Sequence, residues 1–320
     1  MLFPRLFNLF GGVALAAAVT MACSGAKRQA CDYASPQFDP VALARTPGYD
    51  SIPSASTGFV ALQEASGAVP CSWDSTGIWV IEDGGTGPNL FLVHLQTGRV
   101  KAQLQLNAGW TNVDWEDLAH WTDSTGQRWL GIAEIGDNNG VYPTRAIYAL
   151  HEPTGIDTVS GAAASYTPGG TQSWTYVYAD GPRDAESLFV DPVDGRLYVV
   201  SKRDVRNRVY ALPAEPSTGL DTAKAVADLP LFMSTAADRR VLADGRAPLV
   251  IRSYGRLYYW EAEATETACL VLQRTPTELP YTDQEVQGEI IALLPDGSYV
   301  LLSEQVGTAA PKVQVYRALR

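Results

Sequence analysis

The sequence predicts an all-β fold, a five-bladed β-propeller whose blades are four-stranded antiparallel sheets. Three observations predict it. Short apolar runs headed by an acidic residue recur along the 320-residue chain, as at 114–119, 184–189 and 287–292. Each is followed by a turn and a second short run rich in β-branched and aromatic residues, and no segment has the pattern of a long helix. Four-stranded units that repeat every ~40–50 residues are typical of propeller blades.

The strands of each blade follow in order along the chain. The heads of the first strands are expected at Ser66, Glu116, Glu186, Asp238 and Glu289. The second strands are expected at 79–83, 130–134, 198–202, 249–252 and 300–304, each after a turn such as Asp296-Gly297. The third strands are expected at 90–95, 146–150, 208–212, 256–260 and 313–316, and the fourth at 100–106, 173–178, 223–229 and 268–273. A tandem of β-sandwiches is the alternative fold.

The last blade has three strands before the chain ends at Arg320, and 57–63 is a strand without a blade. Pairing between these N- and C-terminal strands would close the ring and leave no exposed edge. The propeller domain is therefore expected over 57–320.

The N-terminal region predicts export. Residues 1–22 have one charge, Arg5, then an apolar stretch and small residues, as in a signal peptide, and the stretch is shorter than the ~20 residues that span a bilayer. Cys23 follows a small residue, as in the lipobox of bacterial lipoproteins, so we expect a lipid on Cys23; an ordinary signal peptide cut nearby is the alternative. Residues 23–56 lack hydrophobic periodicity and predict a flexible stalk. The expected location is the bacterial cell envelope, outside the cytoplasm, on the periplasmic face of the outer membrane or the cell surface.

The net charge of −11, without any block of Lys or Arg, argues against a nucleic-acid partner, which needs a basic face. We expect a monomer that meets the membrane through its lipid alone. In an exported protein a disulfide is permitted, and Cys31 could bridge to Cys71 and leave Cys269 free, although the odd number of remaining cysteines leaves the pairing open.

In such blades, the heads of the first strands and the ends of the second strands meet at one mouth of the central channel. The inner ring would hold the five strand heads given above, and the next ring Asp83, Glu134, Lys202, Arg252 and Glu304. Facing carboxylates need a cation, a proton or a basic partner. Oxygen ligands from several strands suit Ca²⁺, and Asp137 lies nearby in sequence.

We therefore expect Ca²⁺ as a candidate cofactor at Glu116, Glu186, Glu289 and Asp137; a ring of hydrogen-bonded acids without metal is the alternative. Asp83, Glu134, Lys202, Arg252 and Glu304 are the candidate ligand-binding residues. Lys202 and Arg252 could hold a small anionic molecule, or could instead form salt bridges to the ring acids.

Several motifs support a family resemblance: Glu64-Ala65-Ser66-Gly67, the run 112–119 (Asn-Val-Asp-Trp-Glu-Asp-Leu-Ala), and Ile135-Gly136-Asp137-Asn138. With them the chain resembles a family of exported bacterial propeller proteins over nearly the whole predicted domain. More distantly, an acid at each inner-strand head is similar to the esterase-like phytase and gluconolactonase-type propellers. That resemblance implies a metal on the channel axis that polarises an ester or a phosphate, with Glu134 in place of the family's usual Asp.

Three functions follow from these patterns. The first is binding of a ligand or protein partner at an acidic, Ca²⁺-occupied or metal-free axial pocket. The second is a metal-dependent ester or phosphoester hydrolase, in which Ca²⁺ acts as a Lewis acid. The third is an envelope scaffold that uses exposed loops such as 155–172. The sequence shows no catalytic motif of a known hydrolase class, so binding ranks first.

Overall fold

The computed structural model describes residues 32–282, 285, 287–308 and 310–319. The predicted signal peptide (1–22) and the predicted lipidation site Cys23 lie outside these residues. Among the described residues, no helix is both long enough and apolar enough to cross a membrane.

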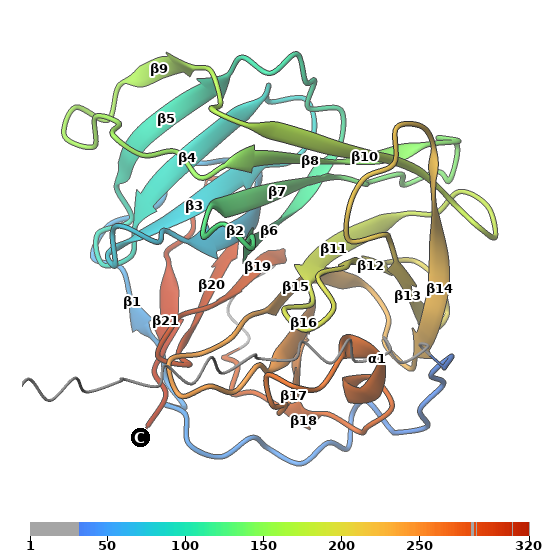
Figure 1. Cartoon of the computed structure of the whole chain (residues 1–320). Helices are drawn as coiled ribbons and strands as arrows, with labels where there is room; N and C mark the ends of the chain where they lie inside the picture. Colours follow the sequence, from blue (N-terminus) through green and yellow to red (C-terminus); the bar gives the residue numbers. More distant parts are fainter. Residues whose placement is uncertain (1–31, 283–284, 286, 309, 320) are drawn as a thin grey trace, which may run out of the picture. The chain divides into compact units, whose positions relative to one another are not determined.

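The domain is all-β, with strands in four hydrogen-bonded sheets (Figure 1). The first sheet has β2 (Ala65–Pro70), β3 (Gly77–Glu82), β4 (Asn89–His94), β5 (Val100–Leu106) and β9 (Ala163–Tyr166). The second has β6 (Trp115–Thr122), β7 (Arg128–Glu134), β8 (Arg145–His151), β10 (Thr171–Tyr178), β11 (Ala185–Val190), β12 (Leu197–Ser201), β13 (Asn207–Ala211) and β14 (Asp221–Leu229). The third has β15 (Ser234–Arg239), β16 (Leu249–Ser253), β17 (Arg256–Trp260) and β18 (Thr277–Glu278). The fourth has β19 (Gly288–Leu293), β20 (Tyr299–Ser303), β21 (Gln314–Tyr316) and β1 (Ser54–Ala55).

The sequence predicted sheets of four strands each, but two of the four sheets have more strands. The eight-stranded sheet is two antiparallel units joined by parallel pairing of β10 with β14, and β9 adds a parallel fifth strand beside β5. The predicted fourth strand at 268–273 is wrong. Its residues 268–271 form the short helix α1 (Ala268–Val271), and the fourth strand of that sheet is the two-residue β18.

We call each run of consecutive antiparallel strands a unit; the units begin with β2, β6, β11, β15 and β19. These first strands surround the middle of the domain. They contact one another in the cyclic order β2, β6, β11, β15, β19 and back to β2 (Figure 1). Gly67 in β2 permits this close approach, because a Cβ atom there would lie 2.6 Å from Cα of Asp117 in β6. Asp117 in turn accepts hydrogen bonds from the backbone N–H groups of Leu188 (2.8 Å) and Ala237 (3.1 Å), which ties β6 to β11 and β15.

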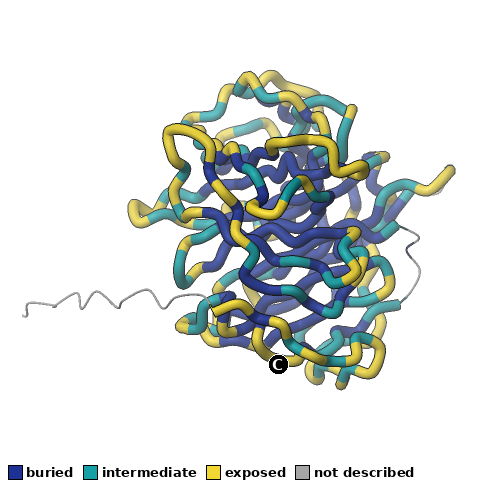
Figure 2. The backbone as a smooth tube through the Cα atoms, turned by 90° about the vertical axis from the view of Figure 1, so that its right-hand side faces the viewer, coloured by how far each residue is buried: buried dark blue, intermediate teal, exposed yellow. Residues whose placement is uncertain are grey.

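The hydrophobic core lies between the successive units. Five clusters of buried residues fill these spaces, one between each pair of neighbours around the ring. Because both faces of the strands are covered, their sequences are continuous apolar runs such as Ile78-Trp79-Val80-Ile81, all fully buried. The buried strands and the exposed loops around them are visible in Figure 2.

The ring is closed by pairing of the N- and C-terminal parts of the domain, but the N-terminal strand lies earlier than predicted. β1 pairs antiparallel with β21 through Ser54 and Ala55. Residues 57–63, the predicted closing strand, form no strand, although the Val60 N–H donates to the carbonyl of Pro311 at 2.8 Å. The prediction misplaced the strand because the apolar residues of 57–63 pack beneath the pairing segment instead of forming it.

The segment before β1 is attached to the sheets where the structure describes it. Isolated bridges join Ala34 to Ala227, Arg45 to Glu278 and Tyr49 to Ala318. The described part of the predicted stalk (23–56) therefore lies along three different units, in contrast to the flexible linker that its composition indicated.

The predicted Cys31–Cys71 bridge is wrong. Cys71 is a free, buried thiol, and Cys269 is disulfide-bonded.

Candidate functional site

A β-bulge lies near the start of each inner strand. The pairing register shifts between Trp115 and Asp117, between Ala185 and Ser187, and at equivalent places in the other units. Such bulges commonly redirect a side chain at a sheet rim. The residues in the bulges are Ser66 with Gly67, Glu116, Glu186, Thr235 and Glu289.

The inner ring differs from the prediction at one position. Thr235 occupies the bulge of β15, whereas the predicted Asp238 lies three residues further along that strand, paired with Val250. The Thr235 hydroxyl donates to the carbonyl of Gly288 at 2.9 Å. The Ser66 hydroxyl likewise donates to the carbonyl of Glu116, so in these two units the hydroxyls join neighbouring strands and leave the acids to the other three.

In each unit, the residue just before the bulge pairs with a residue of the second strand. The second ring consists of the residues that directly follow these pairing partners. Its members are Asp83, Ile135, Lys202, Tyr254 and Glu304. Of the predicted members, Asp83, Lys202 and Glu304 are in this ring, whereas Glu134 and Arg252 lie one and two residues too early. For Glu134, the shift by a single residue turns the side chain to the opposite face of the strand.

Glu134 consequently supports a loop instead of facing the mouth. Its carboxylate accepts the N–H groups of Val113 and Asp114, both at 3.0 Å, and pairs with Arg145 at 3.0 Å. The role of Glu134 is to fix the loop that carries Asp114.

Arg252 is fully buried and forms a salt bridge, the alternative that the sequence analysis left open beside anion binding. It pairs with Glu285 and donates to the carbonyl of Ile290 at 2.6 Å. Burial lowers its pKa, but Glu285 outweighs that effect, and the pKa is raised overall.

Asp137 is likewise a structural residue, not one of the gathered acids. Its carboxylate accepts the N–H groups of Val141 (2.8 Å) and Tyr142 (2.9 Å), and its own N–H donates to Asp184 at 2.9 Å. These bonds close the turn after β7, as expected of an aspartate that precedes Asn and Gly.

Three carboxyl groups do converge at the mouth. One oxygen from each of Asp83, Asp114 and Glu116 lies within 4.8 Å of the other two. Burial first, and then the neighbouring carboxylates, raise the pKa of Asp114 to about 6, and burial followed by Glu186 raises that of Glu116 well above its usual range. Both carboxyl groups therefore keep a proton more readily than an exposed carboxyl group does.

Gly136 and the side-chain amide of Asn112 determine the shape of this cluster. Gly136 lies against both Asp114 and Glu116, and a Cβ there would come 2.6 Å from Oδ2 of Asp114. Asn112 donates to the carbonyls of Glu82 and Asp83, both at 3.0 Å, and so joins the Asp114 loop to the end of β3.

Glu186 and Glu289 share one cation. Lys202 pairs with Glu186, donates to the Tyr254 hydroxyl at 2.9 Å and lies 4.8 Å from the centre of the Tyr254 ring. Burial lowers the pKa of Lys202, but Glu186 and Glu289 raise it overall. The pKa of Glu289 is raised by burial despite the opposing charge of Lys202.

Glu304 completes the acidic side of the mouth. Burial, and then the charges of Glu289, Glu64 and Asp83, raise its pKa to about 8. Gln287 donates to its carboxylate at 2.6 Å. We call Asp83, Asp114, Glu116, Glu186, Glu289 and Glu304 the acidic mouth.

Asp114 and Tyr254 are the members of this site that the sequence analysis did not select. Asp114 stands two residues before Glu116 in the same acidic run, and that neighbourhood was the available signal. Tyr254 follows Arg252 by two residues and could have been found from the correct strand register.

The chemistry of the mouth suits a hard divalent cation. Its donors are carboxylates from different strands and loops, and burial together with the neighbouring carboxylates raises the pKa values of Asp114 and Glu116. Ca²⁺ accepts six to eight such oxygens at ~2.3–2.6 Å in a flexible geometry. Asp83, Asp114 and Glu116 would hold the ion, while Lys202 keeps Glu186 and Glu289 in place.

No family model matches the sequence, and no curated protein matches it. Among solved structures, the PQQ-bound form of aldose sugar dehydrogenase from Streptomyces coelicolor is 11% identical, with a TM-score of 0.42 over 84% of this chain and 99% of that one. Regucalcin from Agrobacterium tumefaciens, a calcium-binding protein, is 14% identical, with a TM-score of 0.39 over 85% and 94%. A protein from Dyadobacter fermentans is 10% identical, with a TM-score of 0.44 over 86% and 100%. At this level the similarities carry no argument about the site, which is interpreted from its own residues.

Proposed function

We propose that this chain is an exported, five-bladed β-propeller that binds Ca²⁺ at the acidic mouth and there captures a ligand or protein partner. The five-bladed arrangement is supported by the cyclic contacts of the inner strands and by the core clusters between successive units. A lipid at Cys23 would hold the protein on the membrane, outside the cytoplasm, as a monomer.

One observation carries the binding proposal: oxygens of Asp83, Asp114 and Glu116 lie close together, and within the described part of the chain no side-chain cation donates a hydrogen bond to them. Lys202, whose charge lowers the pKa values of Asp83 and Glu116, is engaged by Glu186. Arg145, whose charge lowers the pKa of Asp114, pairs with Glu134. Buried like charges are costly without a counterion, so a bound divalent ion offers the largest gain at this point of the fold.

The second candidate function is a metal-dependent ester or phosphoester hydrolase. It is favoured by the position of Lys202 and the Tyr254 hydroxyl beside the carboxylates, because both could donate to a substrate oxygen. Bound Ca²⁺ would polarise that oxygen. We rank it second, because Lys202 would first have to exchange Glu186 for the substrate anion.

Thermal unfolding of the metal-free protein with and without Ca²⁺ tests the proposal. The test uses the variant Cys23→Ser expressed without residues 1–22, which has neither the predicted signal peptide nor the predicted lipid. Ca²⁺ should raise its melting temperature by mass action. Glu116→Gln should lose most of that rise, whereas Glu215→Gln, the same charge change at an exposed loop residue, should keep it. An unchanged melting temperature at millimolar Ca²⁺ would instead favour the metal-free, hydrogen-bonded ring.

The two functions are then separated by activity. Ca²⁺-dependent hydrolysis of generic esters or phosphoesters that Glu116→Gln abolishes would establish the hydrolase. Calcium binding without such hydrolysis supports the binding module.

A further inference from the structure

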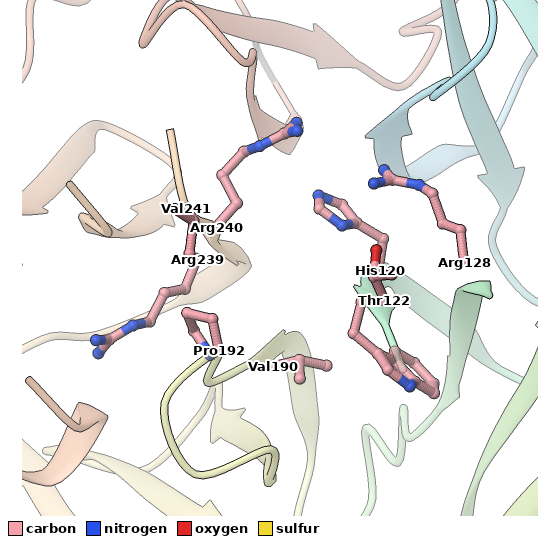
Figure 3. Close-up of a pocket in the computed structure, with 9 residues that line it drawn as sticks. His120, Thr122, Arg128, Val190, Pro192, Arg239, Arg240 and Val241 are labelled. Atoms are coloured by element: carbon pink, nitrogen blue, oxygen red, sulfur yellow. The ribbon is translucent and has the colours of Figure 1, made fainter. Parts of the chain in front are cut away.

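A second site lies at the other end of the inner strands. Glu116 and His120 are both in β6, four residues apart, which at ~3.3 Å per residue places them about 13 Å apart along the strand. Beyond His120, the ends of β6, β11 and β15 surround a cavity of about 400 Å³. Figure 3 shows this cavity, and its lining includes His120, Trp121, Arg128, Pro192, Arg240 and Val241.

The polar groups of this cavity are basic. In Figure 3, His120 and Arg128 extend from one side, and Arg240 lies across the cavity from them. The imidazole of His120 is 9% exposed, and its Nε2 atom has no hydrogen-bond partner. A buried polar atom without a partner costs free energy, which a bound ligand can recover.

Both arginines keep donors available. Arg240 donates from one terminal nitrogen to the carbonyl of Leu293 at 2.9 Å, and its Nε has no hydrogen-bond partner. Arg128 donates to the carbonyl of Pro70 at 3.0 Å, and its Nε lies 3.2 Å from a carboxylate oxygen of Glu152. A second cavity, of about 420 Å³, is also lined by Arg128 and Arg240, so the two arginines stand between two open spaces.

Among the described residues that line the cavity, none is acidic. Burial lowers the pKa of Arg240, Asp238 opposes that effect, and Arg128 lowers the pKa further. Burial and both arginines lower the pKa of His120 well below its usual range. The acids near the two arginines are Asp238, Glu152 and Asp296. Asp238 accepts a hydrogen bond from the Leu293 N–H at 2.7 Å, and Glu152 accepts hydrogen bonds from the Trp79 indole and the Ser72 backbone.

Arg239 does not take part. Its Nε lies 3.5 Å from Asp191 and it donates to the carbonyl of Glu266, while Figure 3 shows its guanidinium directed away from His120. The basic cavity is therefore formed by His120 and Arg128 from the unit of β6 and β7 and by Arg240 from the unit of β15, with the β11 unit between them in the ring.

We propose that this basic cavity binds a small oxyanion, a phosphate or carboxylate group, between Arg128 and Arg240 with His120 as an additional hydrogen-bond donor. Guanidinium groups match the oxygens of both anions, and a neutral imidazole can donate one N–H. The volume admits a compact molecule, not a polymer. The site is independent of the acidic mouth and stands whether or not Ca²⁺ binds there.

Inorganic phosphate is the probe. At constant ionic strength, up to about 10 mM phosphate should raise the melting temperature of the wild-type protein, because it binds the folded state. Isothermal titration should show the affinity falling at least tenfold in Arg240→Gln and in Arg128→Gln, while Arg240→Lys retains part of it. Lys224→Gln, the same charge change at an exposed residue of β14, should bind as the wild type does.

Succinate or citrate in the same titration distinguishes a carboxylate from a phosphate ligand. Circular dichroism and a cooperative unfolding transition establish that each variant is folded. If a variant does not fold, ¹⁵N-labelled histidine in the wild type gives the answer, since the His120 signals must shift during the phosphate titration. No melting shift with any of these anions, or a shift that both arginine-to-glutamine variants retain, would overturn the proposal.

Discussion

Replacing Gly136 by alanine tests the geometry of the acidic mouth without changing any charge. An alanine Cβ would lie 2.6 Å from Oδ2 of Asp114 and closer still to Oε1 of Glu116, whereas real Cβ atoms essentially never come within 3.0 Å of such neighbours. The Asp114 oxygen must therefore move by about 0.4 Å, and that of Glu116 by more. Metal–ligand distances tolerate only ~0.2 Å.

We expect Gly136→Ala to weaken Ca²⁺ binding by at least ~10-fold, the size of effect that displaced supporting groups have at metal sites. Isothermal titration with Ca²⁺ measures it. Gly219→Ala is the matched control, because no atom lies within 4 Å of a Cβ at that position. A Gly136→Ala protein that is folded and binds Ca²⁺ as tightly as wild type would refute the assignment of Asp114 and Glu116 as ligands.

Three further predictions concern stability. Lys202→Met leaves Glu186 and Glu289 buried without their cation and should destabilise the metal-free protein by about 3–5 kcal/mol in urea unfolding; a loss below ~1 kcal/mol would show that the pairing is unimportant. Raised carboxyl pKa values, such as the value of about 8 for Glu304, mean that the folded state binds more protons than the unfolded state between pH 8 and the ordinary value of 4.5. The metal-free protein should therefore melt higher at pH 6 than at pH 8, with a smaller difference in saturating Ca²⁺, and the opposite trend would contradict the acidic mouth. Deleting the residues after Pro311 removes β21 and opens the ring at β1 and β20, so the whole domain should lose stability; an unchanged single unfolding transition would exclude this closure.

The strands could be predicted from the sequence because their signals are local. Runs such as Ile78-Trp79-Val80-Ile81 are buried on both faces, and the turns before them contain glycines with positive φ, as at Gly245 and Gly297 (88° each). These signals do not depend on distant residues. The helix α1 was missed for the same reason, since its four residues are apolar enough to suggest a strand.

The register within each strand could not be predicted. The bulges that hold Glu116, Glu186 and Glu289 have no signature in the sequence, and a strand head displaced by one residue changes the face of every side chain. The sequence analysis selected Asp238 and Arg252 because they are charged, whereas Thr235 and Tyr254 occupy the corresponding positions in the structure. The charged residues at those places are instead buried in contacts with other units.

The sequence analysis identified Glu186 and Glu289, whose contacts depend on the strands, and it missed Asp114, whose contacts depend on a loop. Glu186 and Glu289 are brought to Lys202 by the strands alone. Asp114 reaches the mouth through a loop held by Asn112 and Glu134, contacts that span two units and leave no local pattern.

The most direct measurement of the central claim is a crystal structure grown in Ca²⁺ with its anomalous difference map. The account predicts one strong peak bound by oxygens of Asp83, Asp114 and Glu116 at ~2.3–2.6 Å. A map without a peak at the acidic mouth, with these carboxyl groups joined to one another by hydrogen bonds, would contradict it.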